Sequence, residues 1–511
     1  MQKLTFLLGL VLSFSIIAQP KTTSISVDVE GGEHLINRNI YGHFAEHLGR
    51  CIYGGFYVGE DNELIPHKAG VRTDVIEALK DLKVPVLRWP GGCFADTYHW
   101  MDGIGPKSER PQMVNVWWGG TIEDNSFGTH DFLNLCEELG AEPYLAGNVG
   151  SGLVKELSDW VQYVNHPGGS PMSDLRIANG RKEPWGVKYW GVGNEMWGCG
   201  GNMKPEFYAN LYRQYATFMT DWTNSDGLFR IASGANEWDY KWTEVLMRDV
   251  PHNMLEGVAL HNYAVINWGA KGPDVDFSED QYWTTMKNAL DMEELVTKHS
   301  AIMDKYDPEK KVALIVDEWG GWYETPENQT ALYQQNTMRD AMIAGTTLNT
   351  FHNHADRVRM ANLAQIINVL QAVILTDEEK MILTPTYHVM KMYNVHQDAT
   401  MLPVEISDML YFENGHEKLP AISASASKDN DGAIHISLVN IHPEKSHKLE
   451  MSIDAKGKTT GTILKSGNLQ DHNSFENPDK IAPEAFKGFK KKGNNLNVEL
   501  PPFSVVVLEI K

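Results

Sequence analysis

Apolar, β-branched runs alternate with amphipathic stretches through most of the chain. The runs that predict strands cover residues 40–44, 84–89, 142–146, 187–192, 230–234, 257–260, 312–316 and 358–364. Between them, segments such as VIEALKDL and HDFLNLCEEL place apolar residues three and four positions apart, which is the spacing of one helix face. Eight such alternations predict an α/β fold, a parallel (β/α)8 TIM barrel with insertions. A doubly wound sheet is the alternative, but no GxGxxG sequence follows the first strand.

The pattern changes after residue 398, where predicted strands follow one another without helices between them. The segment LPAISASASKDNDGAIHISLVNIH reads as two strands around Asn430-Asp431-Gly432, which is a hairpin turn signal. Strands of this kind predict a C-terminal antiparallel β-sandwich of the jelly-roll-like type. Residues 24–29, SISVDV, show the same alternation, so we expect them to pair into this sandwich.

The first residues have the pattern of a secretory signal peptide. Lys3 precedes an apolar stretch over residues 4–17, and Ala18 provides a small residue at a cleavage point. No cysteine stands there, and no later stretch is apolar enough to span a bilayer, so we expect export without a membrane anchor, to the periplasm or the cell exterior. The predicted division is a signal peptide over residues 1–18, a strand segment over 19–37, a barrel over 38–398 and a sandwich over 399–511.

The charge balance argues against nucleic acid as a partner. The chain has 511 residues, with 67 acidic and 45 basic side chains and a net charge of -22, which repels phosphate backbones and anionic lipids. The short basic cluster at residues 490–492 does not reverse this and is expected in a solvated loop. The 15 tryptophans and 19 tyrosines offer aromatic faces that can stack on sugar rings.

Four cysteines, Cys51, Cys93, Cys136 and Cys199, are too few for a disulfide scaffold in a chain of this length. They form no C-x-x-C pair, so a structural zinc site is not expected. A single bridge is compatible with an oxidising compartment, and whether Cys51 and Cys93 meet stays open. Cys136 lies in a helical segment and is expected to be a small buried apolar residue.

Acidic, amide, imidazole and aromatic side chains recur where the predicted barrel strands end. The C-terminal ends of barrel strands form the active site in this fold. Glu195 ends the fourth strand and Glu318 the seventh, so closure of the barrel brings two carboxyl groups to one rim. Glycoside hydrolysis uses such a pair, one to protonate the leaving oxygen and one to attack the anomeric carbon.

Two other sequences offer competing sites. Glu237 ends the fifth strand and is the alternative acid/base on strand position alone. His352, His354 and Asp356 have the H-x-H-x-D spacing of some two-metal hydrolases, but Arg357 stands where the next histidine belongs. Nothing in the sequence supplies the second half of such a site, so no metal is expected.

Six motifs follow one another along the chain: FAEHLGRCIYGG, LRWPGGCFADTYHW, KYWGVGNEMWG, LHNY, DEWGGWY and NLAQIINVLQA. In this order they resemble the family-51 glycoside hydrolases, which are retaining α-L-arabinofuranosidases of the large barrel clan. The resemblance covers essentially the whole mature chain, through LPPFSV at residues 500–505. It implies a barrel with catalytic glutamates on strands four and seven, followed by a sandwich.

The resemblance also implies roles for individual residues. Glu195 matches the general acid/base and Glu318 the nucleophile, with Asn194 placed to bind the sugar 2-hydroxyl. Glu237 then becomes a residue that lines or supports the pocket. The other positions matched to sugar binding or to the pocket are Glu46, Arg88, Cys93, His261, Tyr263, Trp319, Trp322 and Gln365.

Several of these matches carry a specific expectation. Arg88 would orient the nucleophile by charge-assisted hydrogen bonds, and His261 and Tyr263 would line the pocket. Trp319 and Trp322 would wall the pocket or its leaving-group side. Glu46 would bind hydroxyls at the pocket floor, and Gln365 would bind the arabinose from strand eight. Cys93 stands where some members have asparagine, and a thiol is a weaker hydrogen-bonding group than an amide.

These features predict an exo-acting α-L-arabinofuranosidase that removes terminal arabinofuranose from arabinan, arabinoxylan or their oligosaccharides by double displacement. No cofactor is expected, because carboxyl groups handle both the protons and the covalent adduct. The resemblance implies a homo-oligomer, often a hexamer. The alternatives are an endo-acting β-glucanase or xylanase on the same barrel, and a non-catalytic carbohydrate-binding protein.

Overall fold

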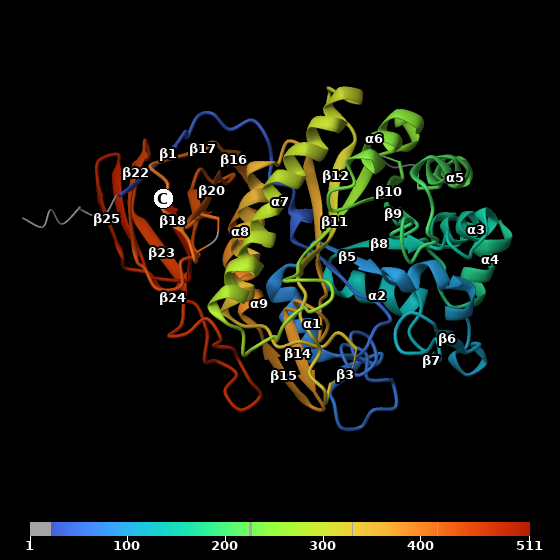
Figure 1. Cartoon of the computed structure of the whole chain (residues 1–511). Helices are drawn as coiled ribbons and strands as arrows, with labels where there is room; N and C mark the ends of the chain where they lie inside the picture. Colours follow the sequence, from blue (N-terminus) through green and yellow to red (C-terminus); the bar gives the residue numbers. More distant parts are fainter. Residues whose placement is uncertain (1–21, 224–226, 330, 416) are drawn as a thin grey trace, which may run out of the picture.

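A computed structural model describes residues 22–223, 227–329, 331–415 and 417–511 of the chain. A barrel with its helices and a smaller β-sandwich lie side by side (Figure 1). The predicted signal peptide, residues 1–18, lies outside the described residues. Among the residues described, no helix has the length and apolar content needed to cross a bilayer.

Eight parallel strands close into the barrel in the order β10-β11-β12-β13-β2-β5-β8-β9. This confirms the predicted (β/α)8 barrel and leaves no place for a doubly wound sheet. The strands are β2 (Gly42–Phe44), β5 (Val86–Trp89), β8 (Glu142–Gly147), β9 (Tyr189–Val192), β10 (Phe229–Asn236), β11 (Gly257–Ala264), β12 (Ala313–Gly321) and β13 (Val358–Ala364).

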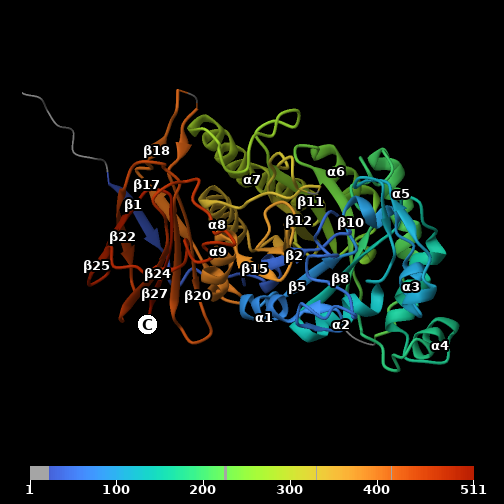
Figure 2. The same cartoon turned by 90° about the horizontal axis from the view of Figure 1, so that it is seen from below.

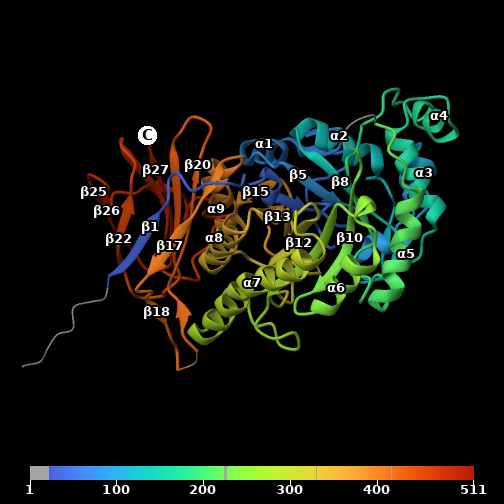
Figure 3. The same cartoon turned by 90° about the horizontal axis from the view of Figure 1, so that it is seen from above.

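Helices surround the barrel, and α8 and α9 lie on the side nearest the sandwich (Figures 2 and 3). The helices are α1 (Thr73–Leu82), α2 (Thr129–Leu139), α3 (Val154–Asn165), α4 (Pro171–Ala178), α5 (Pro205–Phe218), α6 (Tyr240–Asp249), α7 (Glu279–Tyr306), α8 (Met338–Asn353) and α9 (Pro385–Tyr393). Short 3-10 helices are η1 (Arg38–Tyr41), η2 (Cys93–Thr97), η3 (Trp100–Gly103), η4 (Lys107–Glu109), η5 (His252–Met254) and η6 (Asn394–His396).

Three small hairpins are inserted between the barrel elements. They pair β3 (His67–Lys68) with β4 (Val71–Arg72), β6 (Met113–Asn115) with β7 (Thr121–Glu123), and β14 (Ile374–Asp377) with β15 (Lys380–Leu383). The β6–β7 hairpin follows β5 and carries Trp117 and Trp118 in its turn. It therefore belongs to the C-terminal rim of the barrel, where the predicted site lies.

The sandwich consists of two sheets and confirms the predicted C-terminal β domain. The first has the order β17-β1-β22-β26-β25 and the second the order β16-β20-β21-β27-β23-β24. Every pair is antiparallel except β1 with β22, which is parallel. Their bounds are β1 (Thr23–Val27), β16 (Thr400–Leu402), β17 (Val404–Ser407), β20 (Ile422–Lys428), β21 (Ile434–Asn440), β22 (His447–Ile453), β23 (Thr459–Leu464), β24 (Glu484–Ala485), β25 (Phe489–Lys492), β26 (Asn495–Leu500) and β27 (Ser504–Ile510).

Two details of the sandwich differ from a simple reading of the sequence. A separate hairpin pairs β18 (Tyr411–Phe412) with β19 (Leu419–Pro420). Residues 490–492 are not in a loop but in the edge strand β25, where alternate lysines can point to solvent while the backbone pairs with β26. Charged residues on an edge strand discourage pairing with other chains.

The second sheet of the sandwich packs on the barrel through α8, whose residues Met338–His352 are all buried. Strand β21 is buried at every position because one face packs in the sandwich core and the other packs towards the barrel. Ile436 and Leu438 face the sandwich core, whereas Val439 belongs to the apolar cluster of the barrel. Because this core is continuous across the boundary, the sandwich supports the barrel wall that carries Glu318.

Candidate active site

A narrow pocket opens at the C-terminal ends of the barrel strands. Its walls come from the ends of six strands, β2, β5, β9, β11, β12 and β13, from the segments that follow them, and from the β6–β7 hairpin. The lining residues are Phe44, Glu46, Leu48, Gly92, Cys93, Trp118, Asn194, Glu195, Tyr263, Glu318, Trp322, Leu332, Gln365 and Leu370. A broader hollow on the outer sheet of the sandwich is lined by only one carboxylate, Glu450, and so lacks the paired acids of this pocket.

Glu318 lies within β12, and donors on two sides fix its carboxylate. Arg88 Nη1 donates to Oε1 at 2.9 Å, and the Tyr263 hydroxyl donates to Oε2 at 2.8 Å. The guanidinium also donates through Nη2 to Asn194 Oδ1 at 2.5 Å. Charge-assisted hydrogen bonds of this kind hold the carboxylate in one orientation, as attack on carbon requires.

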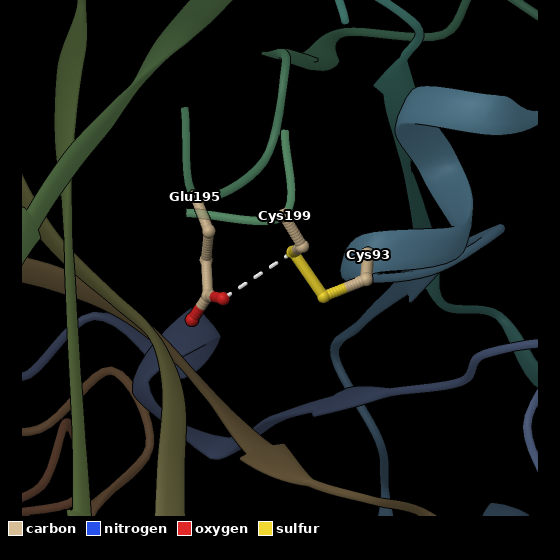
Figure 4. Close-up of side chains that lie close together, drawn as sticks. All are labelled: Cys93, Glu195 and Cys199. Atoms are coloured by element: carbon tan, nitrogen blue, oxygen red, sulfur yellow. Dashed lines mark hydrogen bonds between the residues drawn. A yellow bond between two sulfur atoms is a disulfide. The ribbon is translucent and has the colours of Figure 1, made fainter. Parts of the chain in front are cut away.

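Glu195 lies in the loop after β9, and its backbone φ of 42° is in the left-handed region. Its Oε1 is 2.8 Å from His261 Nδ1, and its Oε2 is 3.5 Å from Cys199 Sγ (Figure 4). Burial and the negative charge of Glu318 raise the pKa of Glu195, against the opposing effect of the hydrogen bond with His261. A raised pKa keeps a proton available for donation near neutral pH.

The spacing of the two carboxyl groups is short. One oxygen of Glu195, one nitrogen of His261 and one oxygen of Glu318 all lie within 4.8 Å of one another. Retaining glycosidases hold their two carboxyl groups about 5–5.5 Å apart, whereas inverting enzymes leave about 6.5–9.5 Å for a water molecule. The separation in this pocket therefore fits a covalent intermediate.

Glu46 is a third carboxyl group that lines the pocket. Its Oε1 accepts from Phe94 N at 3.0 Å and from Trp118 Nε1 at 2.9 Å, and its Oε2 accepts from Gln365 Nε2 at 3.0 Å. Burial raises the pKa of Glu46 to about 7, although the Phe94 amide favours the charged form. A fixed carboxyl beside a fixed amide suits the binding of sugar hydroxyls.

Two segments match families of known proteins. Residues 78–274 match the α-L-arabinofuranosidase 1 domain, and residues 317–504 match the α-L-arabinofuranosidase C-terminal domain. The chain is 53% identical over 507 residues to a protein named intracellular exo-α-L-arabinofuranosidase from Bacteroides ovatus, with 98% of each chain covered. It is 32% identical to α-L-arabinofuranosidase C of Emericella nidulans, over 86% of this chain and 89% of that one.

The solved structure of the family-51 arabinofuranosidase from Xanthomonas axonopodis pv. citri superposes with a TM-score of 0.94 at 44% identity, covering 96% of this chain and 100% of that chain. The chain belongs to the family-51 α-L-arabinofuranosidases. The family is a retaining one. Membership of it confirms the predicted fold and the predicted α-L-arabinofuranosidase activity. An α-L-arabinofuranosidase from Thermotoga maritima, solved with arabinose, superposes with a TM-score of 0.85 at 30% identity over 96% of this chain and 100% of that one.

Two sequence expectations about the arabinofuranosidase pocket are wrong, and a third, for Cys93, holds for its position but not for its thiol. Trp319 does not wall it: the side chain is fully buried and packs edge-on against Phe351 of α8, because neighbours on a strand point to opposite faces. His261 is not among the lining residues either: its Nδ1 contacts Glu195, which lines the pocket, and its Nε2 contacts Asp317, which does not. Cys93 lines the pocket as half of a disulfide with Cys199 and therefore offers no thiol, while Cys51 and Cys136 are free and buried.

Neither competing sequence forms a second site. Glu237 is partly buried and hydrogen-bonds the exposed Trp268, away from the pocket lining. His352 lies at the end of α8, between Tyr41 and Ser425, with both nitrogens in hydrogen bonds. His354 contacts Glu293, so the two histidines do not share a ligand-binding centre.

Four residues important to the pocket were missed in the sequence. Asp96 accepts from the backbone amides of Val149, Gly150 and Asn194, and so ties together the ends of β8 and β9. Asp317 lies behind Glu318, and its position directly before a strand-end glutamate was the available signal. Trp118 and Trp268 come from long insertions whose course only the folded rim defines.

Two groups of side chains have metal-like spacing among the described residues. One contains Cys93, Cys199 and Glu195, but disulfide sulfurs cannot act as thiolate ligands. The other contains Glu195, His261 and Glu318, whose donor atoms are already engaged with one another or with Arg88 and Tyr263. This set matches the carboxylate chemistry of the family better than an ion site.

Proposed function

We propose that this arabinofuranosidase hydrolyses terminal α-L-arabinofuranosides with Glu318 as the nucleophile and Glu195 as the acid/base. The observation that carries the proposal is the close approach of the two carboxyl groups, within 4.8 Å at their nearest oxygens. The environments of Glu318 and Glu195 also differ as a nucleophile and a proton donor require. Glu318 faces Arg88 and a tyrosine hydroxyl, whereas burial favours a proton on Glu195.

In the first step, Glu318 attacks the anomeric carbon while Glu195 gives its proton to the leaving oxygen. The carbon–oxygen bond to the leaving group breaks, an ester bond to Glu318 forms, and Glu195 becomes a carboxylate. Arg88 keeps the nucleophile aimed during attack, and Asn194, held by the same guanidinium, is placed for the sugar 2-hydroxyl.

In the second step, Glu195 takes a proton from water as the water oxygen attacks the same carbon. The ester bond breaks, Glu318 regains its charge, and arabinose leaves with its original anomeric configuration. Glu46 and Gln365 would bind the remaining hydroxyls of the sugar throughout, because both line the pocket and are hydrogen-bonded to each other.

The shape of the site supports exo-action on arabinan, arabinoxylan or derived oligosaccharides. A narrow pocket accepts one terminal sugar, whereas an endo-acting enzyme needs an open cleft. Trp322 lines the pocket, and Trp268, about half exposed, meets it edge-on with ring centroids 5.4 Å apart. We propose that these indoles contact the sugar that carries the terminal arabinose. A bifunctional glucanase-xylanase superposes with a TM-score of 0.61 at 14% identity, a likeness of fold alone.

The test is kinetic and uses aryl α-L-arabinofuranosides with leaving groups of different pKa. Glu318→Ala should abolish turnover of every substrate, and added azide should restore it with inverted configuration. Glu195→Ala should lose about 10²–10⁴-fold on poor leaving groups and far less on good ones, because good leaving groups need little proton donation. Unchanged hydrolysis by Glu318→Ala, or a loss in Glu195→Ala that is equal for all leaving groups, would refute the assignment.

The compartment and assembly state remain predictions. The Cys93–Cys199 disulfide favours an oxidising compartment, whereas the Bacteroides ovatus relative is named intracellular. Cell fractionation with sequencing of the mature N-terminus separates the two: cleavage near Ala18 supports export, and a chain that keeps Met1 in the cytoplasm contradicts it. Light scattering at several concentrations tests the expected homo-oligomer.

A further inference from the structure

His261 bridges two carboxylates, that of Glu195 in the pocket and that of Asp317, which is not among the lining residues. Its Nδ1 is 2.8 Å from Glu195 Oε1, and its Nε2 is 2.9 Å from Asp317 Oδ1. A third acid, Glu318, approaches Nδ1 at 3.5 Å. His261 and Asp317 are almost fully buried, so no bulk water competes for these contacts.

Asp317 is itself held as an anion. The Tyr144 hydroxyl donates to its Oδ2 at 2.9 Å, and Arg88 Nε lies 3.8 Å from the same oxygen. Burial opposes ionisation, but Arg88 and His261 outweigh it and lower the pKa of Asp317. An ionised Asp317 can only accept, so the imidazole nitrogen that faces it must carry a hydrogen.

We propose that Asp317 is a positioning residue for the reaction: acting through His261, it keeps Nε2 protonated and aims Nδ1 at the acid/base. Nδ1–H then donates to Glu195 Oε1, and the acidic proton of Glu195 is a second one, carried on Oε2. When Glu195 has given that second proton to the leaving oxygen, the Nδ1–H group stabilises the carboxylate that remains. This inference rests on the proposed roles of Glu195 and Glu318.

Asp317 has its largest effect in the second step. Formation of the ester removes the charge of Glu318, one of the anions that keep His261 protonated. Asp317 does not react, so it continues to hold the imidazolium while Glu195 acts as a base. Burial opposes the charge on His261, yet Glu318 and Asp317 together raise the pKa of this imidazole to about 10.

Other ionisable groups also face the His261–Asp317 pair and must be considered in any pH experiment. They are Arg88 on β5, Tyr144 on β8, Glu195 after β9, Tyr208 on α5, Tyr263 on β11 and Glu318 on β12. Tyr144 gives a matched control, because it binds the Asp317 oxygen that points away from the imidazole.

The test compares Asp317→Asn with Tyr144→Phe and with the wild type. Without the aspartate charge, His261 loses its proton more readily, and the last proton of the pair then stays on Glu195. The alkaline limb of kcat/KM should therefore move to higher pH. Deglycosylation should slow by about tenfold or more, which gives a burst of the aryl leaving group with activated substrates.

Tyr144→Phe removes a hydrogen bond to Asp317 but leaves its charge and its contact with His261. Its alkaline limb should stay at the wild-type position, whatever happens to the rate. In a His261→Gln background, Asp317→Asn should cause no further shift of the limb, because the two residues act in series. An equal shift in Tyr144→Phe, or an undiminished shift without His261, overturns the proposal.

A purely structural role for Asp317 predicts a different result. Asp317→Asn would then slow both steps alike by disturbing Arg88 and would leave the pH limbs in place, which also overturns the proposal. If Asp317→Asn does not fold, nitrogen-15 NMR of His261 in the wild-type enzyme gives the answer, with His261→Gln used for assignment. Nε2 should be protonated at every pH at which the enzyme is folded; a bare Nε2 contradicts the inference. Failure of the acid/base assignment is recognised separately, by the leaving-group series with Glu195→Ala.

Discussion

At the residue scale, adjacent residues on one strand have different roles because successive side chains point to opposite faces of the sheet. Glu318 points into the pocket, and Trp319, its neighbour, points into the helix layer. The indoles at the pocket come instead from segments beyond the strand ends. Trp322 follows β12, and Trp268 follows β11. These two are the tryptophans to test for contact with the rest of the substrate.

Trp268→Ala should raise KM for arabino-oligosaccharides about tenfold, which corresponds to the loss of about 1.4 kcal/mol of stacking. Hydrolysis of a small aryl arabinofuranoside should change little, because that substrate ends at the pocket mouth. Trp238→Ala is the matched control, since Trp238 is similarly exposed and its ring packs only on Tyr240 among the aromatic contacts of the described residues. Equal effects of the two substitutions on KM would argue against a specific sugar contact.

The sequence was informative about residues wherever a chemical group follows a strand. Glu195, Glu318, Glu46, Asn194 and Gln365 all reach one pocket, as barrel closure implies. Residue order could not reveal the Cys93–Cys199 pair, because its partners lie 106 positions apart on separate loops. Nor does it say which face a strand-end histidine presents, and this is why His261 was wrongly expected to line the pocket.

At the scale of elements, two rim loops hold the acid/base. The loop after β5 supplies Cys93 and Asp96, and the loop after β9 supplies Asn194, Glu195 and Cys199. Asp96 joins them by accepting the Asn194 amide at 2.7 Å, and the disulfide joins them covalently beside Glu195 (Figure 4). Both links restrict the position from which Glu195 donates its proton.

Reduction of the disulfide should therefore affect both stability and catalysis. Opening a loop of 106 residues removes up to about 4–5 kcal/mol of chain-entropy stabilisation. Activity should fall more for poor leaving groups than for good ones, because the loosened loop carries the proton donor. Melting curves and leaving-group kinetics before and after treatment with a phosphine, with thiols counted by mass spectrometry, measure both effects.

The double variant Cys93→Ser with Cys199→Ser should reproduce the behaviour of the reduced enzyme. Cys51 and Cys136 are free and buried beside the intact disulfide and serve as internal controls for the thiol count. Unchanged melting and kinetics after complete reduction would show that Asp96 alone suffices to hold the loop.

Apolar runs located the barrel strands well but gave their ends less well. β12 continues to Gly321, beyond the apolar run 312–316, because Glu318 and Trp319 still pair with β11. Polar residues at such positions interrupt the apolar pattern in the sequence, but the backbone hydrogen bonds between the strands continue. Strand ends near a catalytic pocket are therefore poorly predicted by apolar periodicity.

At the scale of the whole molecule, a polar seam joins the barrel to the sandwich. Serines on β20 and β21 face helical side chains: Ser425 bonds His352 at 2.9 Å, and Ser427 and Ser437 bond His396 at 2.7 and 2.6 Å. Burial lowers the pKa of His352 to about 3 and that of His396 well below its usual value. Both imidazoles are therefore neutral at neutral pH, and protonation would place a charge in the seam.

Acid should weaken the folded enzyme through these histidines. In the unfolded chain a histidine protonates near pH 6.5, whereas folded His352 resists protonation down to about pH 3, so its contribution to stability is present above 6.5 and is lost as pH falls. Between pH 7.5 and 5, the free energy of unfolding should fall by about 2 kcal/mol because of His352.

Denaturant unfolding of the wild type and of His352→Gln at both pH values isolates the contribution of His352 to the free energy of unfolding. The stability advantage of the wild type should shrink by about 2 kcal/mol on acidification. Buried acids with raised pKa values, such as Glu46, act in the opposite direction but are common to both proteins. A constant difference between the two proteins would contradict a neutral buried His352.

Strand β1 has a consequence for how the enzyme is made. It pairs in parallel with β22, where Val27 lies opposite Ile453, so two strands from opposite ends of the chain are neighbours in one sheet. At about 5–20 residues per second, a ribosome needs about 20–80 seconds to reach β22 after it has made β1. The first strand emerges long before its partner exists, and α8 is likewise made before β20, β21 and β27, the strands that pack on it. The barrel is therefore synthesised before the sandwich can form, and translation must be nearly complete before the two ends of the chain can pair in one sheet.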